Sequence, residues 1–202
     1  MNSSRIYHGG GLGRGNGFSG GGAVPGTKYD FERVWIAAND LTPLTAFPAN
    51  GPMTRSFPLT VGSRVMAFSA SELDLVFAWI CLPSKYWDFN FAVGCSLKLY
   101  WFNETTSANI IAWRAEMNYI RHGETCNFAP PALNNMNIAA GTQYLLNVQE
   151  YANFPINNPS GSVVNSEGAF YVKVGRDGTA AEDTYAQEAY LLGVSIDFPL
   201  TY

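Results

Sequence analysis

The chain has 202 residues, of which 14% are charged and 14% are aromatic, and its formal net charge is −4. This length fits a single β-sandwich domain, and a charged share well below the usual ~25% leaves much of the surface uncharged, to be covered in part by other protein. No run of Lys or Arg could gather phosphates, and no apolar run could cross a membrane, so neither nucleic acid nor membrane is expected as a partner.

The first 28 residues are predicted to form an extended arm outside the domain. Residues 8–26 hold half of the chain's 20 glycines, and such a segment cannot bury enough apolar surface to fold alone. Ordering it would cost much conformational entropy, so the arm either lies along a neighbouring subunit or hangs as a flexible tail. In the first case its contacts would be made by Leu12, Arg14, Phe18 and Val24. MNSSRIYHGG leads into glycine, so no signal peptide is expected there.

Residues 29–202 are predicted to form one all-β domain. Apolar residues alternate in many short segments, and no segment of helical length shows a 3.6-residue period. About eight antiparallel strands separated by Pro, Gly and Asn are typical of a jelly-roll-like β-sandwich. Strands are expected at 30–38, 65–68, 73–82, 96–102, 109–120, 144–150, 170–174 and 189–198, with Pro- and Asn-rich loops at 39–60 and 123–140.

Three of these strands carry specific expectations about burial. In 30–38, Phe31, Val34 and Ile36 are available for burial, although the alternation does not fix which face points inward. Residues 73–82 are apolar on both faces, the pattern of a strand buried between two layers. Residues 170–174 alternate cleanly and predict a half-buried strand.

The polar segment 175–184, GRDGTAAEDT, is predicted to be a loop between the last two strands. Arg176 stands at the end of an apolar strand, and an Arg there can bind a carboxylate through two parallel hydrogen bonds. Asp177 and Asp183 supply the carboxylates. We expect these three residues to hold the loop in place, which is a structural role.

No metal site or cofactor site is expected. His122 and Cys126 are four residues apart, but no second pair of ligands stands at zinc spacing. The segment GLGRGNG lacks the preceding strand and following helix of a dinucleotide-binding loop, and His8 has no identifiable partner. Three cysteines at irregular spacing are expected to be free thiols, with one disulfide as the alternative: Cys81, Cys95 and Cys126.

Several acidic residues are candidates for catalytic pairs, because glycosidases use two carboxylates. Such pairs also arise by chance in any β-protein, so no enzymatic activity is expected. The acids of the loop could alternatively bind Ca²⁺ through their oxygens, or simply be solvated. The residues considered are Glu72 with Asp74, Glu182 with Asp183, and Glu116 as pairs, and Asp177, Glu182 and Asp183 for calcium.

The spaced residues of 65–198 resemble a group of tailed-phage virion proteins. The resemblance rests on an apolar strand followed by Arg-Asp, an acidic loop ending in Asp-Thr, and then Ala-x-Leu-Leu-Gly-Val. It implies a jelly-roll protein on the phage particle, commonly trimeric, that cements the capsid or belongs to a fibre, and it brings no catalytic residues. The residues involved include Phe68, Asp74, Pro83, Trp87, Trp101, Trp113, Arg176, Asp177, Asp183, Thr184, Ala189, Leu191, Leu192, Gly193 and Val194.

Two functional hypotheses follow. The leading one is a non-enzymatic capsid decoration or cement protein on the outer surface of the virion, a homotrimer that binds the major capsid protein through its arm. The alternative is a head- or tail-fibre module that binds host-surface carbohydrate, with Trp87, Tyr86 or Tyr151 stacking on sugars. A carbohydrate-active enzyme, the third class, has no supporting constellation of residues.

Overall fold

The computed structural model describes residues 30–43, 53–56, 64–81, 95–121, 123, 133–156 and 168–200. Several residues singled out above lie outside this part of the chain. They are the arm with Leu12, Arg14, Phe18 and Val24, and also His8, Tyr86, Trp87, His122 and Cys126.

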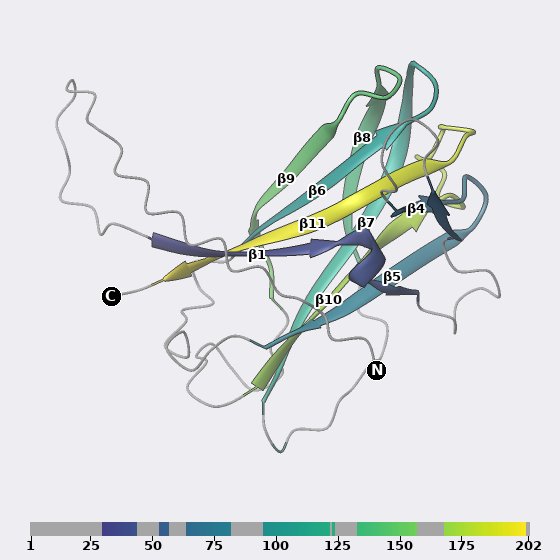
Figure 1. Ribbon diagram of the computed structural model, residues 1–202. Helices are drawn as coiled ribbons and strands as arrows, with labels where there is room; N and C mark the ends of the chain where they lie inside the picture. The colour runs from purple at the N-terminus through teal and green to yellow at the C-terminus, as the bar shows by residue number, and fades with distance from the viewer. Residues whose placement is uncertain are drawn as a thin grey trace, which may run out of the picture.

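Nearly every described residue outside the turns belongs to a β-strand (Figure 1). The strands are β1 Asp30–Ala37, β2 Thr42–Pro43, β3 Met53–Ser56, β4 Arg64–Phe68, β5 Leu73–Ile80, β6 Cys95–Asn103, β7 Ser107–Arg121, β8 Asn134–Gly141, β9 Asn147–Phe154, β10 Gly168–Asp177 and β11 Ala189–Leu200, and one 3₁₀ turn, η1, covers Ala38–Asp40. They form two antiparallel sheets. One has the order β3-β4-β11-β6-β9, with β1 also paired to β11, and the other has the order β2-β5-β10-β7-β8.

The connectivity of β4 to β11 is that of a jelly roll. In the first sheet the last strand of this set, β11, lies between the first, β4, and the third, β6, and β9 follows. In the second sheet β10 lies between β5 and β7, and β8 follows. Successive strands therefore alternate between the sheets, except at the β7–β8 hairpin. The predicted all-β jelly-roll-like sandwich of about eight strands is confirmed, with β1, β2 and β3 added to it.

The core between the two sheets is dominated by aromatic rings. Trp113 of β7 packs edge-on to Phe68 of β4 at 5.3 Å between ring centroids and lies 5.8 Å from Trp101 of β6. Phe170 of β10 lies 4.9 Å from Phe198 of β11. Each of these rings comes from alternate, inward-facing positions of its strand, so the two sheets are joined by large apolar contacts at several levels.

Two of the expected boundaries around the β8–β9 turn are wrong. The predicted loop 123–140 includes all but the last residue of β8, and the strand expected at 144–150 begins only at Asn147, because Tyr144 has a φ of 55° and lies in the turn. Strand β8 has the sequence NNMNIAAG, and asparagine is uncommon in β-strands, so the segment does not stand out as one. Only its alternate residues Met136 and Ala140 are buried, as the edge strand of a sandwich requires.

The burial of two strands also differs from expectation. Strand β5 was expected to be buried on both faces, yet Trp79 on its outer face is 43% exposed, because the sandwich has only two layers. Strand β10 was expected to be half-buried, yet its outward Tyr171 and Lys173 are buried as well. A central strand gains this extra cover from the side chains of both neighbouring strands, as the Phe77–Tyr171 ring contact shows.

Candidate functional site

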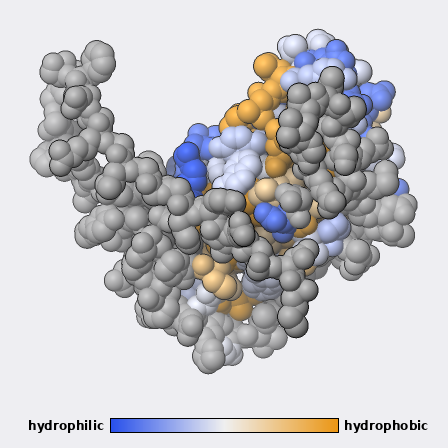
Figure 2. Space-filling model, viewed as in Figure 1, coloured by the Kyte–Doolittle hydropathy of each residue, from blue (hydrophilic) through white to orange (hydrophobic). Residues whose placement is uncertain are grey.

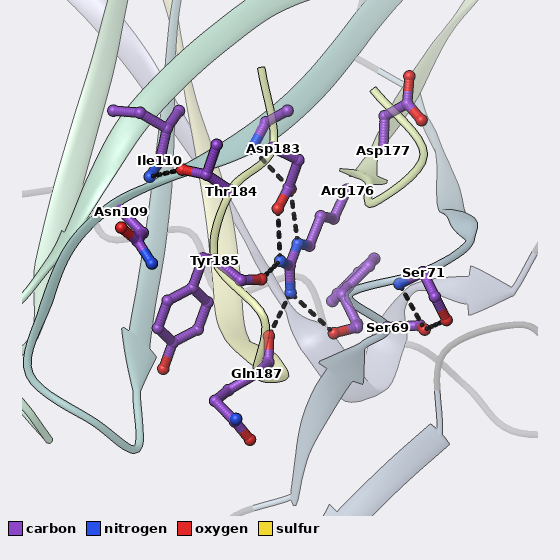
Figure 3. A network of polar contacts seen from close by, with 12 residues as sticks. Ser69, Ser71, Asn109, Ile110, Arg176, Asp177, Asp183, Thr184, Tyr185 and Gln187 are labelled. Carbon is purple, nitrogen blue, oxygen red and sulfur yellow. Dashed lines mark hydrogen bonds and ion pairs between the residues drawn. The ribbon is translucent and has the colours of Figure 1, made fainter. Parts of the chain in front are cut away.

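The loop between β10 and β11 is held by a buried ion pair (Figure 3). The guanidinium of Arg176 donates two hydrogen bonds to Asp183, from Nε at 2.8 Å and from Nη2 at 2.7 Å. Its side chain is 0% exposed, and that of Asp183 is 1% exposed. The remaining donors reach the backbone carbonyls of Gln187, at 2.5 Å, of Phe68, at 3.5 Å, and of Tyr185. A charge this deeply buried is tolerated only because it is paired and hydrogen-bonded.

The same loop is also tied to the neighbouring strand β7. Asp183 accepts a hydrogen bond from the backbone N–H of Ala112 at 2.9 Å. The Thr184 hydroxyl accepts one from the N–H of Ile110, and the N–H groups of Thr184 and Tyr185 donate to the Ile110 carbonyl. These bonds take up backbone groups of β7, so the loop completes the end of the sheet.

Asp177 does not join Arg176. It points away from the guanidinium (Figure 3) and lies 3.5 Å from Nε of Arg114 on β7. Glu182 binds the same arginine at 2.7 Å. The pKa of Glu182 lies below its ordinary value, mainly because of a hydrogen bond with its own backbone and also because of the hydrogen bond from Arg114. The three loop acids considered for calcium are thus divided between two arginines. Within the described residues no cluster of acids, histidines and cysteines fits a metal ion.

The other acids considered as catalytic groups also serve the scaffold. Glu116 is buried on the outer side of β7 and pairs with Lys173 of β10 at 3.0 Å. Asp74 is buried at the start of β5 and accepts a hydrogen bond from the N–H of Ser69, and burial raises the pKa of Asp74. The carbonyl of Glu72 accepts a hydrogen bond from the N–H of Gly178 at 2.9 Å, which joins the β4–β5 turn to the loop.

Two of the three cysteines lie in the described part of the chain, and both are free. Cys81 is exposed, whereas Cys95 lies in the core beside Met117, and burial raises the pKa of Cys95 to about 12. Tyr151, one of the aromatic residues considered for sugar stacking, is half-buried and packs edge-on to Phe154 at 5.0 Å. Its ring thus packs in part against the core.

A different set of residues forms an open polar and aromatic surface, which we call the ladder face. It is the outer side of the six-stranded sheet where β1, β11, β6 and β9 lie side by side (Figure 1). The register places Trp35 opposite Ser195, Ser195 opposite Lys98, and Lys98 opposite Glu150. Hydrophilic and hydrophobic residues adjoin each other over β6 and β9 in Figure 2. Its residues are Arg33, Trp35, Ser96, Lys98, Tyr100, Glu150, Ser195 and Asp197, of which Ser195 and Asp197 are buried.

Trp35 is the aromatic element of the ladder face. Its indole lies against β11 at Gly193, where a Cβ atom would come within 2.6 Å of the ring atom Cζ2. Tyr100 supports the ring edge-on at 4.8 Å between centroids. With one side resting on the sheet, Trp35 is nevertheless 38% exposed. The absence of a side chain at Gly193 therefore lets a large flat ring settle close to the sheet and face solvent.

A row of alternating charges runs beside Trp35. Arg33 donates two hydrogen bonds to Asp197, from Nε at 2.6 Å and from Nη2 at 2.7 Å. Lys98 lies 3.5 Å from both Asp197 and Glu150, and Glu150 accepts a hydrogen bond from the Ser96 hydroxyl at 2.6 Å. Two cations face two carboxylates, so the row carries no net charge. Its outermost members, Arg33 and Glu150, are about half exposed.

The pairing of Arg33 with Asp197 favours the charged form of both groups. Burial alone would favour the neutral form of Asp197, but hydrogen bonds from Arg33 and the charges of Arg33 and Lys98 hold the pKa of Asp197 below its ordinary value. The hydrogen bond to Asp197 in turn raises the pKa of Arg33. The ladder face thus presents hydrogen-bonding groups beside a flat apolar ring, a combination suited to recognising a ligand.

The ladder face is not among the sites predicted from the sequence. The alternation Arg33, Val34, Trp35, Ile36 in the first strand carried a signal, since burying Val34 and Ile36 forces Trp35 outward. The pairing of Arg33 with Asp197 could not be read in the same way, because the two residues are 164 positions apart in the chain.

No protein-family model and no curated protein matches this chain. The solved structures similar to this chain include two at low identity. One is TmCBM61 in complex with β-1,4-galactotriose, with a TM-score of 0.32 and 8% identity over 84% of this chain and 86% of that chain. The other is a CBM4 structure, with a TM-score of 0.27 and 12% identity over 69% of this chain and 82% of that chain. Similarity this low says nothing of the ligand of this chain. Among the described residues, no helix could span a membrane.

Proposed function

We propose that this β-sandwich is a non-enzymatic module that binds carbohydrate on its ladder face. The observation that carries the proposal is Trp35, whose indole rests on Gly193 and is 38% exposed beside a row of hydrogen-bonding groups. An exposed flat ring offers the apolar face of a sugar a surface to stack on, and it does so at little entropic cost because Tyr100 and the sheet hold it in place.

The polar groups beside Trp35 define the kind of sugar that fits. Four strands about 4.8 Å apart give the row from Trp35 to Glu150 a span of roughly 14 Å, long enough for an oligosaccharide instead of a single ring. The guanidinium of Arg33 and the carboxylate of Glu150, each about half exposed, provide a donor and an acceptor for sugar hydroxyls. Since the two cations balance the two carboxylates, neutral glycans are favoured over strongly acidic ones.

A glycan array carrying neutral and acidic oligosaccharides tests this function, followed by calorimetric titration with the best-bound oligosaccharide. Trp35→Ala should weaken binding by roughly tenfold or more, the change that about 1.4 kcal/mol of lost contact gives. Trp79→Ala is the matched control, since Trp79 is a comparably exposed tryptophan on the opposite sheet. Binding by Trp35→Ala as tight as that of the wild type would refute the proposal, as would an array to which the wild type does not bind.

The second candidate is the capsid decoration protein suggested by the sequence resemblance, a homotrimer bound to the major capsid protein on the outer surface of the virion. Its support is the resemblance itself, together with the low charge of the chain and exposed apolar residues such as Leu145 and Leu146. The arm contacts assigned to it lie in residues 1–28. Deleting these residues should leave a folded protein that no longer decorates particles, and normal decoration by the truncated protein would refute this assignment.

The two candidates differ in what the ladder face does. A carbohydrate-binding module loses its ligand when Trp35 is removed, whether or not the arm is present. A protein that only cements a capsid keeps its attachment in Trp35→Ala and loses it when the arm is deleted. Measuring glycan binding and particle decoration for both variants therefore assigns the function without any assumption about the host.

A further inference from the structure

Exposed apolar residues gather at the turn between β8 and β9. Six large hydrophobic side chains are exposed in the described part of the chain, and four of them belong to this turn and the start of β9. We call these four the apolar tip: Tyr144, Leu145, Leu146 and Val148, which are 49%, 55%, 53% and 50% exposed. Hydrophobic residues reach the surface at the upper, β9 side of the molecule in Figure 2.

The apolar tip is held rigidly by the adjacent β6–β7 turn. The N–H of Tyr144 donates to the Asn103 carbonyl at 2.8 Å, and the N–H of Gln143 donates to the Thr106 hydroxyl at 3.0 Å. The φ of 55° at Tyr144 is a left-handed conformation that a bulky side chain adopts at a cost. The turn thus combines a strained backbone conformation with four exposed apolar side chains. This combination favours a binding role over a chance exposure.

Both strands that flank the apolar tip are edge strands of the sheets that the structure describes. Among the described strands, β8 pairs only with β7, and β9 pairs only with β6. Natural edge strands are commonly protected by lysine, proline or inward charges. Strand β8 reads NNMNIAAG without any charge, and β9 reads NVQEYANF with Glu150 as its single charge. Neither sequence is protected in this way, and an unprotected edge accepts another strand edge.

We propose that the apolar tip and the edges of β8 and β9 form the surface through which copies of this chain associate. A second copy supplies what this surface lacks: an antiparallel edge strand to take up backbone hydrogen bonds, and an apolar tip to bury the first one. Four half-exposed side chains make a patch on the order of the few hundred Å² that is often functional on a monomer. Pairing of the β8 and β9 edges would add further buried area, toward the amount that specific interfaces bury.

A membrane is the rival occupant of an apolar tip, and the sequence of the turn disfavours it. Tips that insert into lipid are typically surrounded by Lys and Arg, which anionic headgroups attract. Residues 142–149, TQYLLNVQ, contain neither, and the whole chain has a net charge of −4. Repulsion between copies at the contact is correspondingly absent, since the segment has no charge of either sign.

Sedimentation velocity on the full chain tests this association at about 0.1 mM, well above the dissociation constants of specific interfaces. The wild type should sediment as an oligomer, and Leu145→Ser/Leu146→Ser should sediment as a monomer with unchanged circular dichroism. Trp79→Ser is the control, because it removes an exposed apolar side chain of β5, away from the apolar tip and from both edges, and this variant should remain an oligomer. Hydrogen exchange at β8 and β9 should slow with protein concentration in the wild type and in the control, but not in the double serine variant.

Three results would overturn the proposal. The wild type could remain monomeric at every concentration, or the double serine variant could remain oligomeric, which would place the contact elsewhere. The wild type could also float as a monomer with vesicles of phosphatidylcholine and phosphatidylserine, which would assign the tip to a membrane. None of these outcomes bears on Trp35, so glycan binding measured per subunit keeps the two proposals separate.

Discussion

Removing the carboxylate of Asp183 should strongly destabilise the fold. In Asp183→Ala the guanidinium of Arg176 stays fully buried and loses both hydrogen bonds of its ion pair. Breaking one partner out of a buried pair costs about 3–5 kcal/mol. A domain of this size has about 5–15 kcal/mol of stability in all, so about a fifth or more is lost. At about 2–4 °C per kcal/mol, the melting temperature should fall by about 6–20 °C.

Thermal denaturation followed by circular dichroism measures this loss, with Asp177→Ala as the matched control in the same loop. Asp177 is partly exposed, and when its carboxylate is removed Arg114 keeps Glu182 and Asn137 as partners. The control should therefore melt closer to the wild type. Hydrogen exchange gives a local readout, because the N–H of Ala112 donates to Asp183 and should exchange faster in Asp183→Ala alone. Equal melting of Asp183→Ala and wild type would refute the argument.

Two further predictions concern titration and thiol reactivity. Because the pKa of Asp197 is lower in the fold than in the unfolded chain, its contribution to stability is complete above the unfolded pKa of about 3.9 and is lost as pH falls through the folded pKa. Urea unfolding from pH 2 to 7 should show a weaker acid dependence in Asp197→Asn, and an unchanged dependence would contradict the assignment. In a Cys126→Ser background, Ellman's reagent should modify exposed Cys81 at neutral pH and buried Cys95 only on unfolding, since the pKa of Cys95 is about 12. Rapid modification of two thiols in the folded protein would show that Cys95 is accessible.

The fold could be predicted from the sequence because a two-sheet sandwich imposes a period of two on its strands. The alternation in 96–102 and 109–120 matches the strands β6 and β7, whose inward residues carry the core tryptophans Trp101 and Trp113. The same reasoning missed β8, because an edge strand needs only a few inward apolar residues and asparagine fills the rest. Its pattern, buried at Met136 and Ala140, is too sparse to stand out from a loop.

The candidate site was less predictable, because it depends on contacts between distant strands. An arginine beside acidic residues suggested the Arg176 clamp, but the sequence could not assign Asp177 to Arg114, which is 63 positions away, from their numbers alone. The ladder face depends on the same kind of information. Lys98 is placed between Asp197 and Glu150 by the order β11-β6-β9, and only the completed sheet brings these charges together.

The ladder face and the apolar tip are joined through one row of the sheet. Val148 of the tip lies opposite Tyr100, and Tyr100 supports the ring of Trp35. Copies that associate through their tips would therefore bring their ladder faces onto one assembly, each near the contact. Even where a single ladder face binds a repeating glycan only weakly, the assembly would bind it strongly. Once one face is bound, the others bind the same glycan at a high effective concentration. In Leu145→Ser/Leu146→Ser, the affinity for a surface coated with the glycan should consequently fall to about the affinity of one subunit for a single oligosaccharide. The affinity for the single oligosaccharide should stay unchanged.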